Sequence, residues 1–170
     1  MKVRADSFFL DAIPSDSAMK LAAVSHAQLQ SFLRYHFKDD TLNVPHIYVY
    51  TGSFARLITH TLKIGAITFG RRVLVSPALV ERDELQQLIV PGWLVAHEAI
   101  HVLQYEQAGF IGFLVSYLKN YWRALLEQRG YGSAARMSAY LSIAEEQSAR
   151  EAERAYRVWR ADSSFVTGEK

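Results

Sequence analysis

The sequence contains no cysteine, and this absence excludes several kinds of site. Disulfides, zinc sites built on thiolates and cysteine nucleophiles are impossible in a chain without thiols. The chain also has little net charge, since its Lys and Arg residues number 19 and its Asp and Glu residues 17. A balance of +2 gives no electrostatic basis for binding nucleic acid, so we expect no nucleic-acid partner.

Long apolar runs are missing as well. The longest, residues 110–115, is far shorter than the roughly 20 residues needed to span a bilayer, so we expect no membrane span. The basic N-terminus has only a short apolar run before Asp11, which is not the pattern of a secretory signal peptide. We therefore expect a protein that is cytoplasmic at synthesis, with signal-independent export left open.

The length and the composition predict a single domain over residues 1–170. Half of the 170 residues are hydrophobic, which is enough to form a buried core without stabilising disulfides or structural metals. The sequence contains no repeats and no low-complexity linkers. Hydrophobic periodicity and β-branched runs predict an α+β fold that is mainly helical. The expected helices are residues 17–37, 53–62, 92–108, 110 to about 129, and 134–160, with a strand at 46–51 and a β-hairpin at 64–76.

Three weaker expectations concern particular segments. Residues 80–87 are polar and are expected to form a connection along the protein surface, with a helical turn after Asp83. The apolar residues of the segment that begins at Phe110 recur at spacings of three and four, which predicts a stripe packed in the core. Residues 161–170 are expected to be frayed.

The most informative motif is H-E-x-x-H, formed by His97, Glu98 and His101. Two imidazoles four residues apart on a helix project from the same face and can hold one metal ion. Glu98 lies about 100° further round the helix, where it can accept a proton from water activated by the metal. The motif therefore predicts a zinc site with Glu98 as its general base.

Apolar residues cover almost every face of this helix, which predicts that it is buried all round. Buried histidine and glutamate side chains are costly unless a partner satisfies them, and a bound cation would do so. The alternative is a core helix whose histidines find carbonyl partners. The apolar residues are Leu94, Val95, Ala96, Ala99, Ile100, Val102 and Leu103.

A catalytic zinc site needs a third protein ligand. The metzincin extension that supplies a third histidine is missing, because Gln104 and Gln107 stand at its glycine and histidine positions. A carboxylate from a later helix is therefore expected, and the candidates are Glu145, Glu146, Glu151 and Glu153.

Two arguments from the residues disagree about which carboxylate it is. Helical spacing places Glu145 on one apolar stripe with four other residues, which are Leu141, Ala149, Ala152 and Tyr156. Glu146, in contrast, is followed three residues later by Ala149, whose small side chain would let this helix approach the motif helix closely.

Residues 46–104 resemble a zinc metallopeptidase family, the core domain of extracellular contractile injection system toxins. The resemblance rests on a strand, a small helix, an A-x-T-x-G hairpin at residues 66–70, and an A-H-E-x-x-H-V-x-Q helix. It implies a gluzincin-like, zincin-like layout, in which the hairpin forms a sheet edge where an extended peptide could add as a strand. The later segment AYLSIAEEQSAREAE, residues 139–153, resembles the ligand-bearing helix of such proteins, which aligns Glu146 with the third ligand, and Glu146 and Ala149 match the gluzincin pattern Glu-x-x-Ala. At the two preceding positions, where similar chains commonly carry a proline and an aromatic residue, this chain has Ala144 and Glu145.

The sequence thus predicts a zinc-dependent peptidase acting on peptide or protein substrates, with Zn²⁺ held by His97, His101 and Glu146. An additional donor to the oxyanion is expected among Tyr131, Tyr140 and Arg150. One alternative is a catalytically silent, zinc-stabilised binding or toxin-associated module. Another is a purely structural helical domain without metal.

Overall fold

The structure is a computed structural model that describes residues 18–82, 88–128 and 130–167. Within these ranges it is mainly helical with two small sheets, so the expected α+β class is confirmed. The helices are α1 (Ala23–Phe37), α2 (Ser53–Leu62), α3 (Gly92–Ala108), α4 (Phe110–Leu126), α5 (Ser133–Ser142) and α6 (Ala144–Thr167). The strands are β1 (Ala18–Lys20), β2 (Tyr48–Tyr50), β3 (Ala66–Phe69), β4 (Arg72–Val75), β5 (Glu81–Arg82) and β6 (Leu88–Ile89).

The larger sheet has the strand order β1-β2-β4-β3 and is of mixed direction. Strands β2 and β4 run parallel, whereas β1 and β3 pair antiparallel to their neighbours. The predicted hairpin is present as β3 and β4, and its two-residue turn begins at Gly70, whose φ of 60° suits a residue without a Cβ. Strand β3 is the outer strand on that side of the described sheet.

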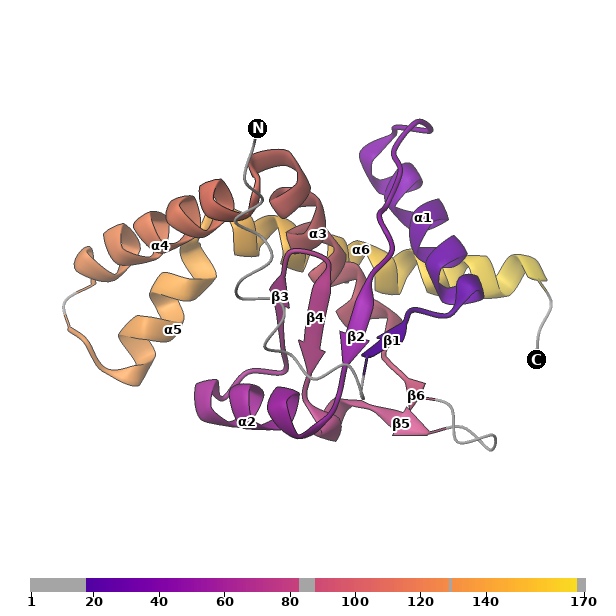
Figure 1. Cartoon of the computed structure of the whole chain (residues 1–170). Helices are drawn as coiled ribbons and strands as arrows, with labels where there is room; N and C mark the ends of the chain where they lie inside the picture. The colour runs from indigo at the N-terminus through magenta and orange to yellow at the C-terminus, as the bar shows by residue number, and fades with distance from the viewer. Residues whose placement is uncertain (1–17, 83–87, 129, 168–170) are drawn as a thin grey trace, which may run out of the picture.

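Helix α3, which carries the motif, is the centre of the fold. It packs against α6, β3, α4 and α1, and Figure 1 shows it behind the sheet with α6 crossing behind it. As predicted, the helix is buried on nearly every face from Leu94 to Leu103. A helix without a solvent face has no water to satisfy its polar side chains, so the surrounding elements must provide their partners.

The prediction of one helix over residues 17–37 is wrong at its start. Ala18–Lys20 form β1, which pairs with β2, and α1 begins only at Ala23. Its N-cap residue is Ala22, which has no side-chain oxygen to cap the helix. Pairing with a strand that lies far away in the sequence therefore determines where α1 begins.

The prediction of one last helix over residues 134–160 is also wrong. Ile143 has an extended backbone, with φ of −70° and ψ of 137°, and it separates α5 from α6. Its side chain is buried, and its carbonyl accepts hydrogen bonds from the amides of Glu146 and Gln147 at the start of α6. Helix α6 then continues through Thr167, beyond the point where fraying was expected.

Helix α4 does not place its whole apolar stripe in the core. It packs beside α5, and Figure 1 shows the two helices extending away from the sheet. Of its large apolar residues, Phe113 and Leu125 are buried, but Leu118, Trp122 and Leu126 are exposed. The core prediction is therefore wrong for much of the stripe, because only one narrow face of α4 meets the rest of the chain. Among the described helices, none is long and apolar enough to cross a membrane.

The segment expected to lead over the surface contains a small second sheet. Strands β5 and β6 pair antiparallel, with Glu81 opposite Ile89 and Arg82 opposite Leu88. The helical turn expected after Asp83 falls on residues 83–87, which lie outside the described residues.

Candidate metal centre

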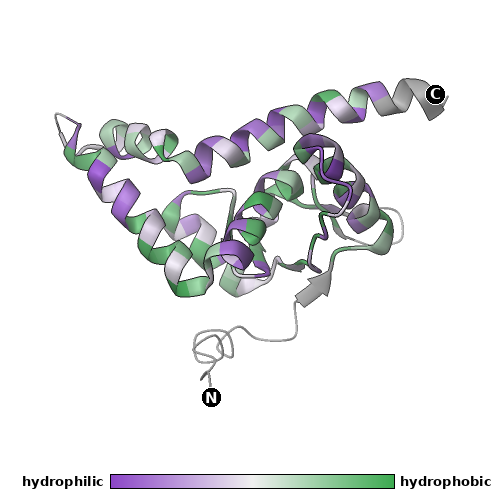
Figure 2. Ribbon diagram, turned by 90° about the horizontal axis from the view of Figure 1, so that it is seen from above, coloured by the Kyte–Doolittle hydropathy of each residue, from purple (hydrophilic) through white to green (hydrophobic). Residues whose placement is uncertain are grey.

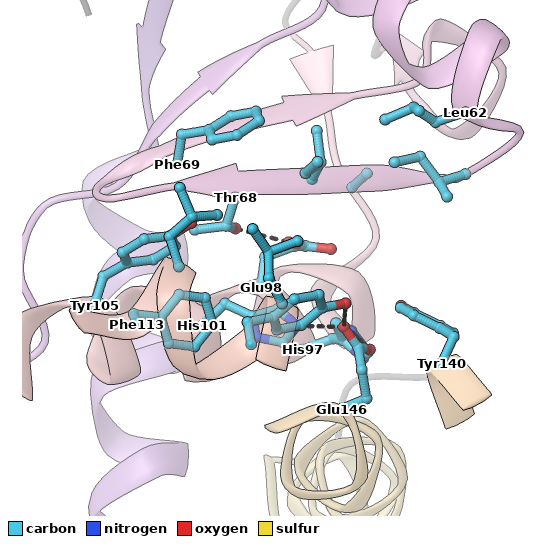
Figure 3. A pocket seen from close by; sticks show the side chains of 16 residues that line it. Leu62, Thr68, Phe69, His97, Glu98, His101, Tyr105, Phe113, Tyr140 and Glu146 are labelled. Carbon is cyan, nitrogen blue, oxygen red and sulfur yellow. Dashed lines mark hydrogen bonds and ion pairs between the residues drawn. The ribbon is translucent and has the colours of Figure 1, made fainter. Parts of the chain in front are cut away.

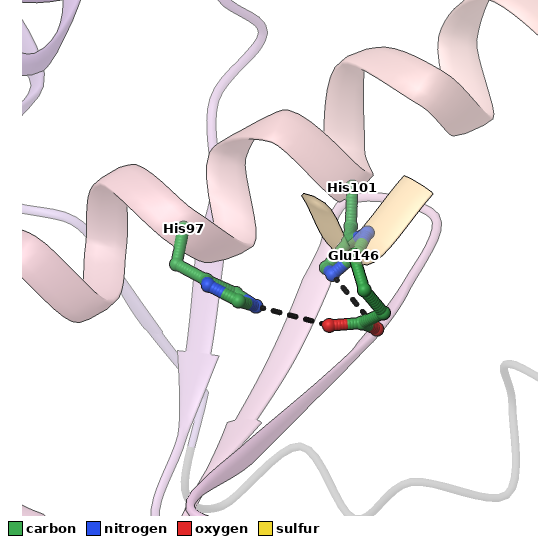
Figure 4. Close-up of side chains that lie close together, drawn as sticks. All are labelled: His97, His101 and Glu146. Carbon is green, nitrogen blue, oxygen red and sulfur yellow. Dashed lines mark ion pairs between the residues drawn. The ribbon is translucent and has the colours of Figure 1, made fainter. Parts of the chain in front are cut away.

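The two motif histidines lie one helical turn apart on α3 and point to the same place. Their ring centroids are 5.2 Å apart, and both side chains are buried. Each Nε2 atom is directed at the carboxylate of Glu146 (Figure 4). The spacing of four residues therefore places both imidazoles on the same face of the helix, as the sequence predicted.

Glu146 reaches this point from the first turn of α6. It is 3 % exposed, and it lies on the buried face of the helix with Ala149, Ala152 and Tyr156. The two alanines have no exposed surface, so α6 can approach α3 closely at this level. Figure 2 shows α6 running along one side of the molecule, with hydrophobic and hydrophilic residues alternating towards the C-terminus.

The distances fit a tetrahedral metal ion. His97 Nε2 lies 3.6 Å from Glu146 Oε2, and His101 Nε2 lies 3.5 Å from Glu146 Oε1. Two ligands bound about 2.0 Å from a tetrahedral zinc ion would be about 3.3 Å apart. Among the described residues, these three form a buried group that could hold a metal ion, with ligand atoms all within 4.8 Å of one another.

One oxygen of the Glu146 carboxylate is buried without a hydrogen bond. Its Oε2 atom is buried and accepts no hydrogen bond, although an unsatisfied buried carboxylate oxygen is costly. The other oxygen, Oε1, accepts a hydrogen bond of 2.8 Å from the Tyr117 hydroxyl. A cation between the three side chains would satisfy Oε2, which is the second reason why the residues present fit a metal.

Glu145 has a different environment from Glu146. Its carboxylate faces α4, where it accepts hydrogen bonds from the Ser116 hydroxyl and the Asn120 amide. The break at Ile143 removes only Leu141 from the predicted stripe, since the other three residues share α6 with both glutamates. The structure nevertheless places Glu146 against the histidines of α3 and Glu145 against α4. Of the other candidates, Glu151 is exposed and Glu153 lies beside His97.

Each motif histidine is also supported at its other ring nitrogen. His97 Nδ1 lies 3.5 Å from Glu153 Oε2, and His101 Nδ1 lies 2.9 Å from Gln104 Oε1. The Gln104 amide nitrogen donates to Ser148 Oγ and to the Glu145 carbonyl, and this fixes which end of the amide faces the histidine. Since Gln104 Oε1 only accepts, the proton of a neutral His101 must be on Nδ1, which leaves Nε2 free to bind a metal.

Replacing Glu153 with glutamine should weaken metal binding about tenfold to a hundredfold. The change removes the charge that orients His97 and keeps its Nδ1 protonated, but it leaves the three proposed ligands in place. Competition against a chromophoric chelator measures the affinity. Glu151→Gln is the matched control, because Glu151 is exposed on the same helix. Equal affinities for the Glu153→Gln variant and the wild type would contradict a supporting role for Glu153.

Glu98 projects into a pocket beside the three-residue group. It is 4 % exposed, and its Oε2 accepts a hydrogen bond of 2.7 Å from Thr68 Oγ1 on β3 (Figure 3). The pocket has a volume of about 370 Å³ and is lined by Glu98, both histidines and Glu146. The Thr68 contact holds the carboxylate at the pocket wall, where it is available to a molecule bound next to the histidines.

The acidic neighbours of His97 change its protonation in the metal-free protein. Burial alone would lower the pKa of His97, but pairing with Glu146 and the charges of Glu98 and Glu153 raise it above 6.5. Burial would likewise raise the pKa of Glu146, but pairing with His97 and the charge of His101 lower it below 4.5. Each group thus favours the charged form of the other.

These shifts predict a pH range of greatest stability for the metal-free protein. The stability contributed by His97 is complete below pH 6.5 and is lost as the pH rises through its higher folded pKa. The stability contributed by Glu146 is complete above pH 4.5 and is lost as the pH falls through its lower folded pKa. The melting temperature in chelator should therefore be highest between these two values. A His97→Asn variant should lack the decline above pH 6.5, and a decline of equal size in both proteins would contradict the assignment.

Of the three candidate oxyanion donors, only Tyr140 is among the described residues that line the pocket. Tyr140 lines the pocket, Arg150 lies over the Tyr140 ring at 5.8 Å, and Tyr131 is exposed. The sequence analysis missed Tyr117, which also lines the pocket and donates to Glu146. No sequence signal separates Tyr117 from the other aromatic residues on α4. Burial and the charge of Glu146 raise the pKa of both Tyr117 and Tyr140, so both hydroxyls keep their protons at neutral pH.

Comparison with protein-family models, curated proteins and solved structures gives no match to this chain. The resemblance to the injection-system toxin family therefore stays a prediction from the motif and the hairpin. The case for a metal at this site rests on the geometry of His97, His101 and Glu146 and on the Glu146 oxygen that accepts no hydrogen bond.

Proposed function

We propose that the protein is a zinc-dependent peptidase, with His97, His101 and Glu146 as metal ligands and Glu98 as general base. The observation that carries the proposal is the convergence of three buried ligand side chains on one point, where Glu146 Oε2 accepts no hydrogen bond. A purely structural core would not be expected to leave that oxygen without a hydrogen bond.

The chemistry of the ligand set favours zinc. Two imidazoles and one carboxylate are the ligands of catalytic zinc in one large class of peptidases, which leaves a fourth position for water or substrate. Bound at this site, the ion would supply Lewis-acid activation of water and of a carbonyl oxygen. The adjoining pocket gives a substrate access to this position.

Glu98 would transfer the protons. Its carboxylate would accept a proton from the attacking water and deliver it to the departing amine nitrogen. Thr68 would hold one carboxylate oxygen through its hydrogen bond, leaving the other for the water. Tyr117 and Tyr140 carry protonated hydroxyls into the same pocket and are the nearest candidates to donate to the oxyanion.

The position of β3 supports a peptide as the substrate. Four consecutive residues, Ala66–Phe69, form this outer strand and line the pocket. An extended chain lying along the outer edge of β3 in the described sheet would pair with this strand and place a peptide bond near Glu98. This arrangement is the one implied by the resemblance to the zinc metallopeptidase family.

Metal analysis and an activity assay together test the proposal. Protein dialysed without chelator should retain about one zinc per chain, and it should cleave unfolded casein in a manner that a chelator abolishes and added zinc restores. Bound zinc without cleavage of casein or of a peptide library would overturn the enzymatic proposal and favour the catalytically silent, zinc-stabilised module. Failure to bind any divalent metal would favour a purely structural domain.

A further inference from the structure

The walls of the pocket are apolar, and they come from two separate parts of the chain. One wall is formed by the end of α2 and by the hairpin, and the other by α3 and α4 (Figure 3). The first wall contains Leu62, Ile64, Ala66, Ile67 and Phe69. The second contains Tyr105, Phe113, Leu114, Tyr117 and Leu118.

No described residue of either wall carries a charge at neutral pH. Burial raises the pKa of Tyr105 to about 12, so this tyrosine does not ionise at neutral pH. The two carboxylates that line the pocket, Glu98 and Glu146, belong to the proposed catalytic site and to neither apolar wall. A charged group held between the walls would lose its hydration without gaining a counter-charge from either wall.

We propose that this pocket selects a bulky, uncharged apolar side chain of the substrate, of the size of leucine or phenylalanine, next to the bond that is cleaved. The inference rests on the proposed peptidase function, because the pocket is continuous with Glu98 and the candidate ligands. Each substrate methylene that the apolar walls remove from water makes the free energy of binding more favourable. The pocket volume of about 370 Å³ is large enough for such a side chain.

Leu118 is the position from which this selectivity can be changed. It lines the pocket but is 45 % exposed at the surface of α4, so a longer polar side chain there can extend to the mouth without disturbing the core. Val115 lies on the same helix and is 59 % exposed, but it does not line the pocket. Leu118→Lys and Val115→Lys therefore form a matched pair, in which the same charge is added inside and outside the pocket.

Binding to the Glu98→Gln protein loaded with zinc tests the inference without turnover. Blocked alanine-based pentapeptides whose central residue is Phe, Leu, Glu or Lys are titrated by calorimetry. The Phe and Leu peptides should bind at least about tenfold more tightly than the Glu and Lys peptides. Adding Leu118→Lys should remove this preference and favour the Glu peptide, whereas adding Val115→Lys should leave it unchanged.

Three results would overturn the inference: charged peptides bound as tightly as apolar ones, no detectable binding of any peptide, or equal effects of the two lysine variants. Digestion of the same peptides by the wild-type protein separates this proposal from the one it rests on. Preferential binding of apolar peptides without cleavage would support the pocket and overturn the peptidase. Cleavage without preference for an apolar side chain would support the peptidase and overturn the selectivity.

Discussion

Glu98→Gln should reduce the rate of peptide hydrolysis by about 10²-fold to 10⁴-fold, the usual contribution of a general base. Glutamine has nearly the same shape as glutamate, and its amide oxygen can still accept the hydrogen bond from Thr68. It cannot accept a proton from water at neutral pH. The zinc content and the melting temperature should therefore remain close to those of the wild type while kcat falls.

The matched control is Glu106→Gln on the same helix. Glu106 is a surface residue that pairs with Arg71, and it does not line the pocket. Its replacement should leave the hydrolysis rate unchanged. Cleavage by the Glu98→Gln protein at the wild-type rate, with zinc bound, would show that the carboxylate of Glu98 is not the base.

Zinc should stabilise the wild-type protein strongly and the Glu146→Gln variant only weakly. At a free zinc concentration 100 times Kd, binding adds about 2.7 kcal/mol to the free energy of unfolding. A variant with a hundredfold weaker Kd would gain only about 0.4 kcal/mol under the same conditions. The amide of glutamine is a poor substitute for the carboxylate that faces both histidines. Thermal unfolding with and without zinc measures both values.

Glu145→Gln is the control for this experiment. Glu145 precedes Glu146 in the chain, but its carboxylate does not face the histidines. It accepts hydrogen bonds from Ser116 and Asn120 of α4. Zinc should stabilise this variant as it does the wild type. Loss of the zinc effect in Glu145→Gln, with the effect retained in Glu146→Gln, would mean that the ligand assignment is wrong.

Local patterns in the sequence predicted several elements correctly. The helix at Ser53–Leu62, the hairpin of β3 and β4, and the buried helix α3 all lie where periodicity and turn residues placed them. The pattern that predicted each of these elements lies in residues that are close together in the sequence. Gly70, for example, sets the hairpin turn through its own backbone conformation.

The elements that were predicted wrongly depend on distant contacts. Residues 18–20 are extended because they pair with β2, about 30 residues further along the chain. Helix α4 leaves Leu118 and Trp122 exposed because its neighbours cover only one narrow face of it. Periodicity shows that a face is apolar, but it does not show what covers that face.

The sequence alone determined which side chains of α3 share a face, because the geometry of a helix fixes the directions of His97, Glu98 and His101. The sequence favoured Glu146 over Glu145, but only the tertiary structure shows that Glu146 is the carboxylate that faces the histidines. Helix α6 begins after the extended residue Ile143, with Glu146 facing the histidines and Glu145 facing α4. Neighbouring residues on a helix point about 100° apart, so this choice depends on how α6 is rotated against α3, which long-range packing determines.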